Sequence, residues 1–310
     1  MQRGENVMAD PRVIGLRSVE FGVADVAATA KFYQERWGLP LVAEEGGSAF
    51  LRASGPEHHI VVLHQRATPG VVRTNLAAPD KATVDAMHAR IVGLGAEALG
   101  APGELAQPGG GYGFDFRDPD GQLFRISAEV ARHADAADAE DRPDKLSHVV
   151  LNSDRVDAQT EWFCDVLGFK LSDRTERMHF IRCSTDHHSI AHARADGPSL
   201  NHVAFEMPSF NALMFGAGRM KSTGYPVEWG VGRHGPGNNI YTYFIEPNGL
   251  VIEYTAEVEQ VDDSYKAGTP EDWKRPEGGF DRWRFSEPPS PRLRKAMHGE
   301  PQPPIAAAAE

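Results

Sequence analysis

The sequence predicts an α+β fold of two domains, each made of two βαβββ modules that share one curved mixed sheet. The first observation behind this prediction is that a strand, a helix and further strands recur in the same order, at a constant spacing, in both halves of the chain. The second is that both halves close on the same kind of turn, at residues 118–121 and 246–249. The third is a finer repeat within the second half, where residues 146–150 resemble residues 200–204 and a helix is expected after each. The positions that match between the halves are Ser18 and His148, Phe32 and Trp162, and Gly38 and Gly168.

The composition fits two globular domains and narrows the range of partners. The chain has 310 residues, of which 41% are hydrophobic and 25% charged, so each domain has enough apolar residues for a packed core. A net charge of −12 argues against a nucleic-acid partner, which would require a basic face. No apolar run is long enough for a transmembrane helix, and the first residues lack the apolar stretch of a signal peptide. The two cysteines, Cys164 and Cys183, suit a reducing cytoplasm better than a disulfide scaffold.

The first predicted domain spans residues 12–130 and contains the first copy of the pattern that the second half repeats. Its first helix is expected to begin after Asp25, whose side chain can cap the first turn, and to end at Gly38, which tolerates a left-handed conformation. The turn at residues 118–121 joins its last two strands. The other expected segments are strands at 13–16, 19–21, 49–52, 60–63, 112–116 and 123–127, and a helix at 81–94.

The second predicted domain spans residues 144–257 and repeats this pattern. A linker is expected at residues 131–143, because that segment is polar, rich in Ala and Asp, and ends in proline. The first helix of the second domain is expected to begin at Asp154 and to end at Gly168. Residues 258–310 are rich in proline and charged residues, which predicts an irregular C-terminal tail with a disordered end.

The last hairpin of the second domain carries an acidic residue where an apolar one is expected. Glu253 lies within residues 250–254, which otherwise read as a buried strand that follows the turn at 246–249. A buried carboxylate needs a partner, and a metal ion is one of the few good ones. Glu253 is therefore a candidate metal ligand.

Two histidines occupy equivalent positions in the finer repeat. Pairing of the two modules would bring His148 and His202 face to face inside the sheet. Together with Glu253 they would form a site of two histidines and one carboxylate that leaves up to three positions open, as in non-haem Fe(II) oxygenases. Closed structural zinc sites usually contain cysteine, and neither cysteine lies in a ligand-like pair. The alternative is that each histidine is simply a hydrogen-bonded core residue, which is the commoner role of a single histidine on a strand.

The first domain serves as a control within the same chain. At the positions equivalent to His148 and Glu253 it has Ser18 and Arg125. Because a guanidinium cannot bind a cation, a site of this kind is expected only in the second domain.

The residues around the last hairpin also resemble the pattern of an enzyme family. That pattern is a Gly-x-His, a short spacer, a Tyr, an acidic residue followed by Pro-x-Gly, and a final Glu. Over residues 12–257 the chain resembles the type I extradiol ring-cleaving (catechol) dioxygenases of the vicinal oxygen chelate, or glyoxalase/bleomycin resistance, superfamily. It departs from the pattern at Thr242, where the family has an aliphatic residue. The residues that carry the resemblance are Gly232, Arg233, His234, Tyr243, Glu246, Pro247, Asn248, Gly249 and Glu253.

This resemblance implies the vicinal oxygen chelate fold, in which each domain is a curved, partly open mixed-sheet barrel. It also implies that His148, His202 and Glu253 hold Fe(II), or Mn(II) as in some members. The substrate would be a catechol and the co-substrate O2, in the catabolism of aromatic compounds in the cytoplasm. The expected assembly is a homo-oligomer, a dimer or tetramer, without a nucleic-acid or membrane partner.

The resemblance further implies three catalytic residues besides the metal ligands. His188 would be the acid/base, Tyr243 would donate a hydrogen bond to a substrate oxygen, and His234 would orient that oxygen. His187 is the alternative to His188, because adjacent residues of an extended strand face opposite sides and only one can face the metal. Tyr241 is the alternative to Tyr243, since both lie on the same side of one strand.

Two other functions remain open. One is a metal-dependent lyase or isomerase of the glyoxalase type, which is disfavoured because such sites usually take ligands from both halves of the fold and the first half offers Ser18 and Arg125. The other is a non-catalytic ligand-binding protein of the same fold, which would need no metal triad.

Overall fold

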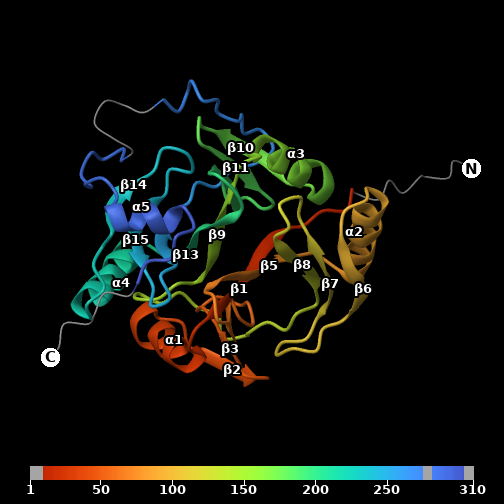
Figure 1. Ribbon diagram of the computed structural model, residues 1–310, viewed down its shortest axis with the longest axis horizontal. Coiled ribbons are helices and arrows are strands. Elements are labelled where there is room, and N and C mark those ends of the chain that lie inside the picture. Colours follow the sequence, from red (N-terminus) through yellow and green to blue (C-terminus); the bar gives the residue numbers. More distant parts are fainter. Residues whose placement is uncertain (1–9, 275–280, 304–310) are drawn as a thin grey trace, which may run out of the picture.

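Two eight-stranded mixed sheets form the body of the molecule (Figure 1). The structure, a computed structural model, describes residues 10–274 and 281–303. The strands lie in the order β2-β3-β4-β1-β5-β8-β7-β6 in the first sheet and β10-β11-β12-β9-β13-β16-β15-β14 in the second. Each half-sheet is one βαβββ module, and the two modules of a sheet meet along an antiparallel pair, β1 with β5 or β9 with β13. This confirms the predicted α+β fold of four modules, with sheets that curve without closing.

The first sheet and its helices occupy the segment predicted as the first domain. The elements are β1 (Gly15–Val23), α1 (Val26–Phe32) continued by a π-helical turn (Tyr33–Trp37), β2 (Leu41–Glu45), β3 (Ser48–Leu51), β4 (Val61–Gln65), β5 (Gly70–Ala77), α2 (Lys81–Gly93), β6 (Ala98–Glu104), β7 (Tyr112–Arg117) and β8 (Leu123–Ala128).

The second sheet repeats this order, and one more helix follows it. The elements are β9 (Lys145–Ser153), α3 (Val156–Leu167), β10 (Lys170–Arg174), β11 (Met178–Arg182), β12 (Ile190–Arg194), β13 (Ser199–Glu206), α4 (Phe210–Ser222), β14 (Trp229–Arg233), β15 (Ile240–Ile245), β16 (Val251–Ala256) and α5 (Pro291–Met297).

Local chemistry sets the helix ends. Asp25 caps α1, because its carboxylate accepts a hydrogen bond of 2.9 Å from the Ala28 backbone N–H. Gly38 and Gly168 end the first helix of each half in the left-handed conformation, with φ of 91° and 75°. The second of these helices begins at Val156 rather than at Asp154, because the Ser153 hydroxyl turns the chain by accepting from the Arg155 N–H at 2.9 Å.

The two halves share one hydrophobic core. At their contact the indole of Trp37 stacks on the ring of Tyr254, with centroids 3.6 Å apart, and the Tyr254 hydroxyl donates to the Trp37 carbonyl at 2.6 Å. Because Tyr254 directly follows Glu253, the packing between the halves also holds the strand that carries this acid.

The tail departs from the predicted irregular structure in one respect. It contains α5, whose first turn is capped by the Ser290 hydroxyl accepting from the Leu293 N–H at 2.9 Å. Before this helix, the tail is fastened to the second sheet by Asp281, whose carboxylate accepts from the Arg233 backbone N–H at 2.8 Å. Of the predicted disordered end, residues 301–310, only residues 301–303 lie among the described residues.

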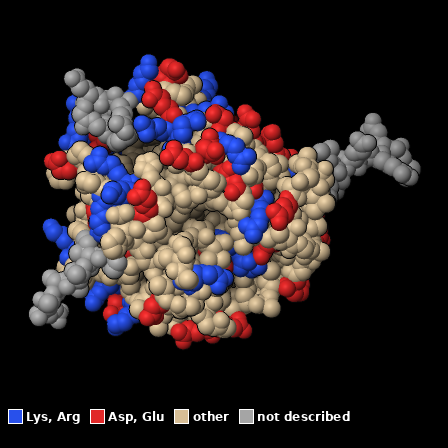
Figure 2. All heavy atoms as spheres, in the orientation of Figure 1, with Lys and Arg blue, Asp and Glu red and all other residues tan. Residues whose placement is uncertain are grey.

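The surface shows no large basic patch on the face drawn in Figure 2, where acidic and basic side chains alternate around a hollowed centre of other residues. Among the described helices, none combines the length and the apolar character needed to cross a membrane.

Candidate metal centre

The register of four neighbouring strands aligns three of the predicted site residues in one row. Glu253 on β16 pairs with Tyr243 on β15 on one side and with Ala204 on β13 on the other. Ala204 in turn pairs with His148 on β9. Residues paired directly across strands point to the same face, and His202 shares that face because it lies two positions before Ala204 on β13. The fold therefore places His148, His202 and Glu253 on one side of the second sheet.

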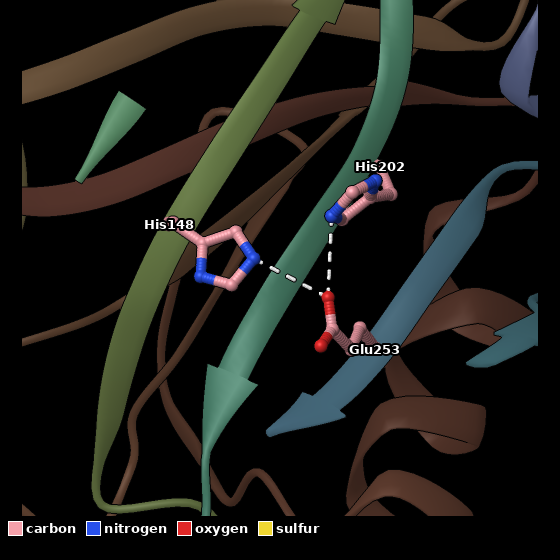
Figure 3. A group of neighbouring side chains, drawn as sticks. All are labelled: His148, His202 and Glu253. Carbon is pink, nitrogen blue, oxygen red and sulfur yellow. Dashed lines mark ion pairs between the residues drawn. The ribbon is translucent and has the colours of Figure 1, made fainter. Parts of the chain in front are cut away.

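The three side chains converge on one point (Figure 3). Glu253 Oε2 lies 3.3 Å from His148 Nε2 and 3.2 Å from His202 Nε2. The candidate ligand atoms all lie within 4.8 Å of one another. Ligand atoms bound at about 2.1 Å to one metal and at right angles to each other lie roughly 3.0 Å apart, so these separations suit ligands of a shared ion.

Burial and hydrogen bonding also fit a metal ion. Glu253 is fully buried, and neither of its carboxylate oxygens has a hydrogen-bond partner of acceptable geometry among the described residues. Burial on its own raises the pKa of Glu253, but the imidazoles of His148 and His202 outweigh it and hold this pKa below its usual range. A buried carboxylate that stays charged yet lacks donors is costly unless a cation binds it.

Polar neighbours turn both imidazoles so that Nε2 faces the carboxylate. The Asn201 amide oxygen lies 2.8 Å from His202 Nδ1, and the Ser147 hydroxyl lies 3.2 Å from His148 Nδ1. Asn201 is itself oriented, since its NH₂ group donates to the Asn152 amide oxygen at 3.0 Å. With the proton on Nδ1 bonded to Asn201, His202 keeps the Nε2 lone pair that a metal would need.

Loss of the Asn201 amide oxygen should weaken metal binding without emptying the site. We expect Asn201→Ala to lower metal affinity about 10–100-fold, because His202 loses the acceptor that fixes its ring. Competition between the protein and a chelator for Mn(II) measures the change. Asn201→Asp, which keeps an acceptor beside His202 Nδ1, should retain most of the affinity. Equal affinity in Asn201→Ala and the unchanged protein would show that the Asn201 contact does not orient this ligand.

The two adjacent histidines face different partners. The ring of His188 lies against that of His148, with centroids 4.3 Å apart, whereas His187 Nε2 lies 2.8 Å from the Asp173 carboxylate. The segment that holds them is a turn before β12, not the extended strand assumed from the sequence, but their rings still diverge. Burial, reinforced by the neighbouring imidazoles, holds the pKa of His188 well below its usual value. The ring beside the metal triad is thus that of His188.

Tyr243 and His234 meet on the other side of Glu253. The Tyr243 hydroxyl lies 2.9 Å from His234 Nε2, which is 4.0 Å from Glu253 Oε1. Burial, and then the charge of Glu253, raises the pKa of Tyr243 well above its usual value, so its phenol stays protonated and can donate. Tyr241 is engaged elsewhere: its hydroxyl lies 3.0 Å from the Ser286 hydroxyl of the tail. Of the two phenols, that of Tyr243 lies at the triad.

In the first sheet an ion-pair network occupies the equivalent positions. The row that matches the triad runs through Asp115, Arg125, Asn75 and Ser18. Arg73 pairs with Asp115 at 2.6 Å and with the buried Glu20 at 2.8 Å, and Arg125 pairs with Asp115 at 2.6 Å. Every carboxylate in this network has a guanidinium partner, so it offers no vacant ligand set for a cation.

The sequence alone did not indicate the residues that surround the ligands and the catalytic candidates. The missed residues are Asn152, Asn201, Asp173 and Gly237. The backbone of Gly237 lies against the rings of His187 and His188. One signal was available: Asn201 directly precedes a candidate ligand, and polar residues beside metal-bound histidines commonly orient them.

Most of the chain matches a known protein superfamily. The model of the Glyoxalase/Bleomycin resistance protein/Dioxygenase superfamily matches residues 15–126 and 145–254. A solved structure of a Mn(II)-bound glyoxalase from Novosphingobium aromaticivorans is 39% identical, covers 96% of each chain and superposes with a TM-score of 0.85.

Two curated relatives match part or most of the chain. Metapyrocatechase 2 of Cupriavidus necator is 32% identical over 122 residues, a match that spans only 38% of either chain. Biphenyl-2,3-diol 1,2-dioxygenase of Metapseudomonas furukawaii is 25% identical over 264 residues, which cover 79% of this chain and 86% of that enzyme.

Proposed function

The chain belongs to the Glyoxalase/Bleomycin resistance protein/Dioxygenase superfamily, and we propose that within it the chain is an extradiol dioxygenase that cleaves a catecholic ring with O2. The observation that carries this proposal is a buried carboxylate without hydrogen-bond donors between two imidazoles, with His188 beside them. Three open positions on a metal held by His148, His202 and Glu253 would accommodate a chelating diol and O2. The similarity to metapyrocatechase 2 and to biphenyl-2,3-diol 1,2-dioxygenase supports the same reaction and its place in aromatic catabolism.

The proposed metal is Fe(II), with Mn(II) as the alternative suggested by the Mn(II)-bound relative. Two imidazole nitrogens and one carboxylate oxygen are donors that suit either ion. When bound, the metal would supply a centre that holds the diol and O2 next to each other and lets electrons pass between them.

The chain's own residues would handle protons and substrate position. His188 would take a proton from the diol as it binds and return it later, since its ring lies beside the triad. Tyr243 would donate its phenolic proton to a substrate oxygen, because burial keeps this group protonated. Burial lowers the pKa of His234 to about 4, so this ring is neutral near pH 7; with its proton on Nε2 it can donate to the Tyr243 oxygen and so leave the phenolic proton free for the substrate. Each of these side chains is mostly buried, which limits competition from water.

A glyoxalase-type lyase or isomerase is the second candidate function. It is favoured by the 39% identity to a protein named as a glyoxalase. It is disfavoured by the first sheet, where Arg73 and Arg125 occupy the positions that would have to supply ligands from the other half.

The deciding experiment compares both reactions in one preparation. Protein loaded anaerobically with Fe(II), and in parallel with Mn(II), is given a panel of catechols while O2 uptake and a yellow ring-fission product are recorded. The same samples are tested without O2 for isomerisation of a hemithioacetal formed from a 2-oxoaldehyde and a thiol. We expect O2 uptake matched by product. Isomerisation without O2 uptake, in protein shown to hold metal, would favour the glyoxalase reaction instead.

We also propose that the protein acts as a homo-oligomer in the cytoplasm. Cys164 and Cys183 are both free thiols, which suits a reducing compartment. Helix α4 exposes three large apolar side chains, Phe210, Met214 and Phe215, which suits burial against a second copy. Light scattering at micromolar concentration would detect a dimer or tetramer.

A further inference from the structure

A chain of buried polar groups leads away from the metal centre behind His188. His188 Nδ1 lies 3.1 Å from His187 Nδ1, and His187 Nε2 lies 2.8 Å from Asp173 Oδ2 on β10. Asp173 and His187 are fully buried and His188 is 3% exposed. Neither Asp173 nor His187 touches the triad, so the proposed reaction leaves both unexplained.

The tail holds the far end of this chain. The Gly268 backbone N–H donates to Asp173 Oδ1 at 2.7 Å, and the Tyr265 hydroxyl donates to Asp173 Oδ2 at 3.3 Å. The rings of Tyr265 and His187 also pack in a T-shaped pair, with centroids 5.7 Å apart. An ionised carboxylate only accepts hydrogen bonds, so Asp173 takes its third bond from a proton on His187 Nε2.

When each imidazole carries a single proton, these contacts fix which nitrogen holds it. With the proton of His187 on Nε2, its Nδ1 is an acceptor. The proton in the contact between the two rings must then come from His188 Nδ1. His188 is left with an unprotonated Nε2, which is the nitrogen that can accept a proton from a bound substrate.

The first half of the chain keeps the histidine pair and lacks the carboxylate. His58 and His59 lie Nδ1 to Nδ1 at 3.0 Å, as His187 and His188 do. Asp173 pairs with Phe180 across its hairpin, and the equivalent pair in the first half is Ala43 with Phe50. The carboxylate therefore accompanies the histidine pair only in the half that has the triad.

We propose that Asp173 and His187 are positioning residues that hold His188 in the tautomer with a free Nε2, and that the tail segment at Tyr265 and Gly268 holds Asp173 in place. The further step, in which His188 Nε2 accepts a proton from the substrate, rests on the proposed dioxygenase function. The hydrogen-bond arrangement itself does not depend on the reaction.

Histidine tautomers in the metal-free protein provide the first test. Long-range ¹H–¹⁵N correlation spectra of protein labelled at histidine distinguish an Nδ1 proton from an Nε2 proton. We expect the proton of His187 on Nε2 and that of His188 on Nδ1. A His188 proton on Nε2, or a His187 ring protonated on both nitrogens, would overturn the proposal without any variant.

Asp173→Asn should reverse both tautomers. In this variant the Gly268 N–H still needs an acceptor, so the amide oxygen takes the place of Oδ1. The amide NH₂ group then takes the place of Oδ2 and faces His187 Nε2. His187 must then carry its proton on Nδ1 and donate to His188, which moves the His188 proton to Nε2. Unchanged tautomers in a folded Asp173→Asn protein would also contradict the proposal.

Kinetics of the holoenzyme separate positioning from mere support of the fold. We expect Asp173→Asn to lower kcat with the best catechol by about 100-fold or more, as for other catalytic histidines held in the wrong tautomer, while KM and metal content change little. His58→Gln, at the first-half position equivalent to His187, should leave kcat unaltered. Should Asp173→Asn fail to fold, Tyr265→Phe tests the same contact more gently, with a smaller loss of kcat at unchanged KM.

The outcomes also separate this proposal from the proposed function. If the unchanged protein holds metal but consumes no O2 with any catechol, the function fails, and the tautomer spectra still decide the hydrogen-bond arrangement. If the unchanged protein is active and Asp173→Asn keeps full kcat, the positioning role fails while the function stands.

Discussion

Replacing Glu253 with glutamine is expected to abolish metal binding and turnover together. The carboxylate is the only anionic group among the three converging side chains, and its Oε2 atom lies within 3.3 Å of both imidazole nitrogens. An uncharged amide in this place gives up most of the electrostatic attraction for a divalent cation. We therefore expect the affinity for Fe(II) or Mn(II) to fall by more than the roughly 100-fold that is typical for loss of an outer hydrogen bond.

Metal content and thermal unfolding together test this expectation. Excess Mn(II) should raise the unfolding midpoint of the unchanged protein and leave that of Glu253→Gln where it was. Glu206→Gln, on the strand that carries His202, should keep the rise of the unfolding midpoint with Mn(II), since Glu206 pairs with Lys145 and is not one of the three candidate ligands. Stoichiometric metal in Glu253→Gln would remove this acid from the ligand set.

Replacing His188 with phenylalanine is expected to spare the metal and remove turnover. The ring of His188 packs against His148 and Phe180, so a phenyl ring of similar shape fits the same space. What is lost is the nitrogen that would exchange a proton with the substrate. General acid/base catalysis typically contributes about 10²–10⁴-fold, and we expect a loss of kcat in that range.

Metal analysis, anaerobic titration with a catechol and steady-state O2 uptake check this result. Metal content and catechol affinity should match those of the unchanged protein, and the rate of O2 uptake should fall. His192→Phe makes the same exchange at another buried histidine, one that packs on Phe163 away from the triad, and should leave kcat unaltered. Full turnover in His188→Phe would show that another residue is the acid/base, and His187 and His234 would then be the candidates.

Three strands of the first sheet were not predicted from the sequence: β2 and β6, which lie at its edges, and the central β5. Strand β2 ends in the exposed Glu44 and Glu45, and β6 contains two glycines and a proline, so neither shows the apolar pattern of a half-buried strand. Strands β1 and β9 and the closing hairpins were predicted because their side chains are buried and their turns need particular residues. Pairing along the sheet, rather than local preference, makes β2 and β6 into strands.

By itself, the sequence determined the four-module repeat and the residue types of the candidate site. These follow from local chemistry: helix caps, turn residues, and polar groups in apolar runs recur at matching positions in each module. Only the tertiary structure decided which neighbour faces the site. His188 rather than His187 lies at the triad, Asn201 contacts the candidate ligand His202, and Asp173 contacts the neighbour of the candidate catalytic histidine. Such contacts depend on strand register and on a tail distant in the chain, so no local pattern could specify them.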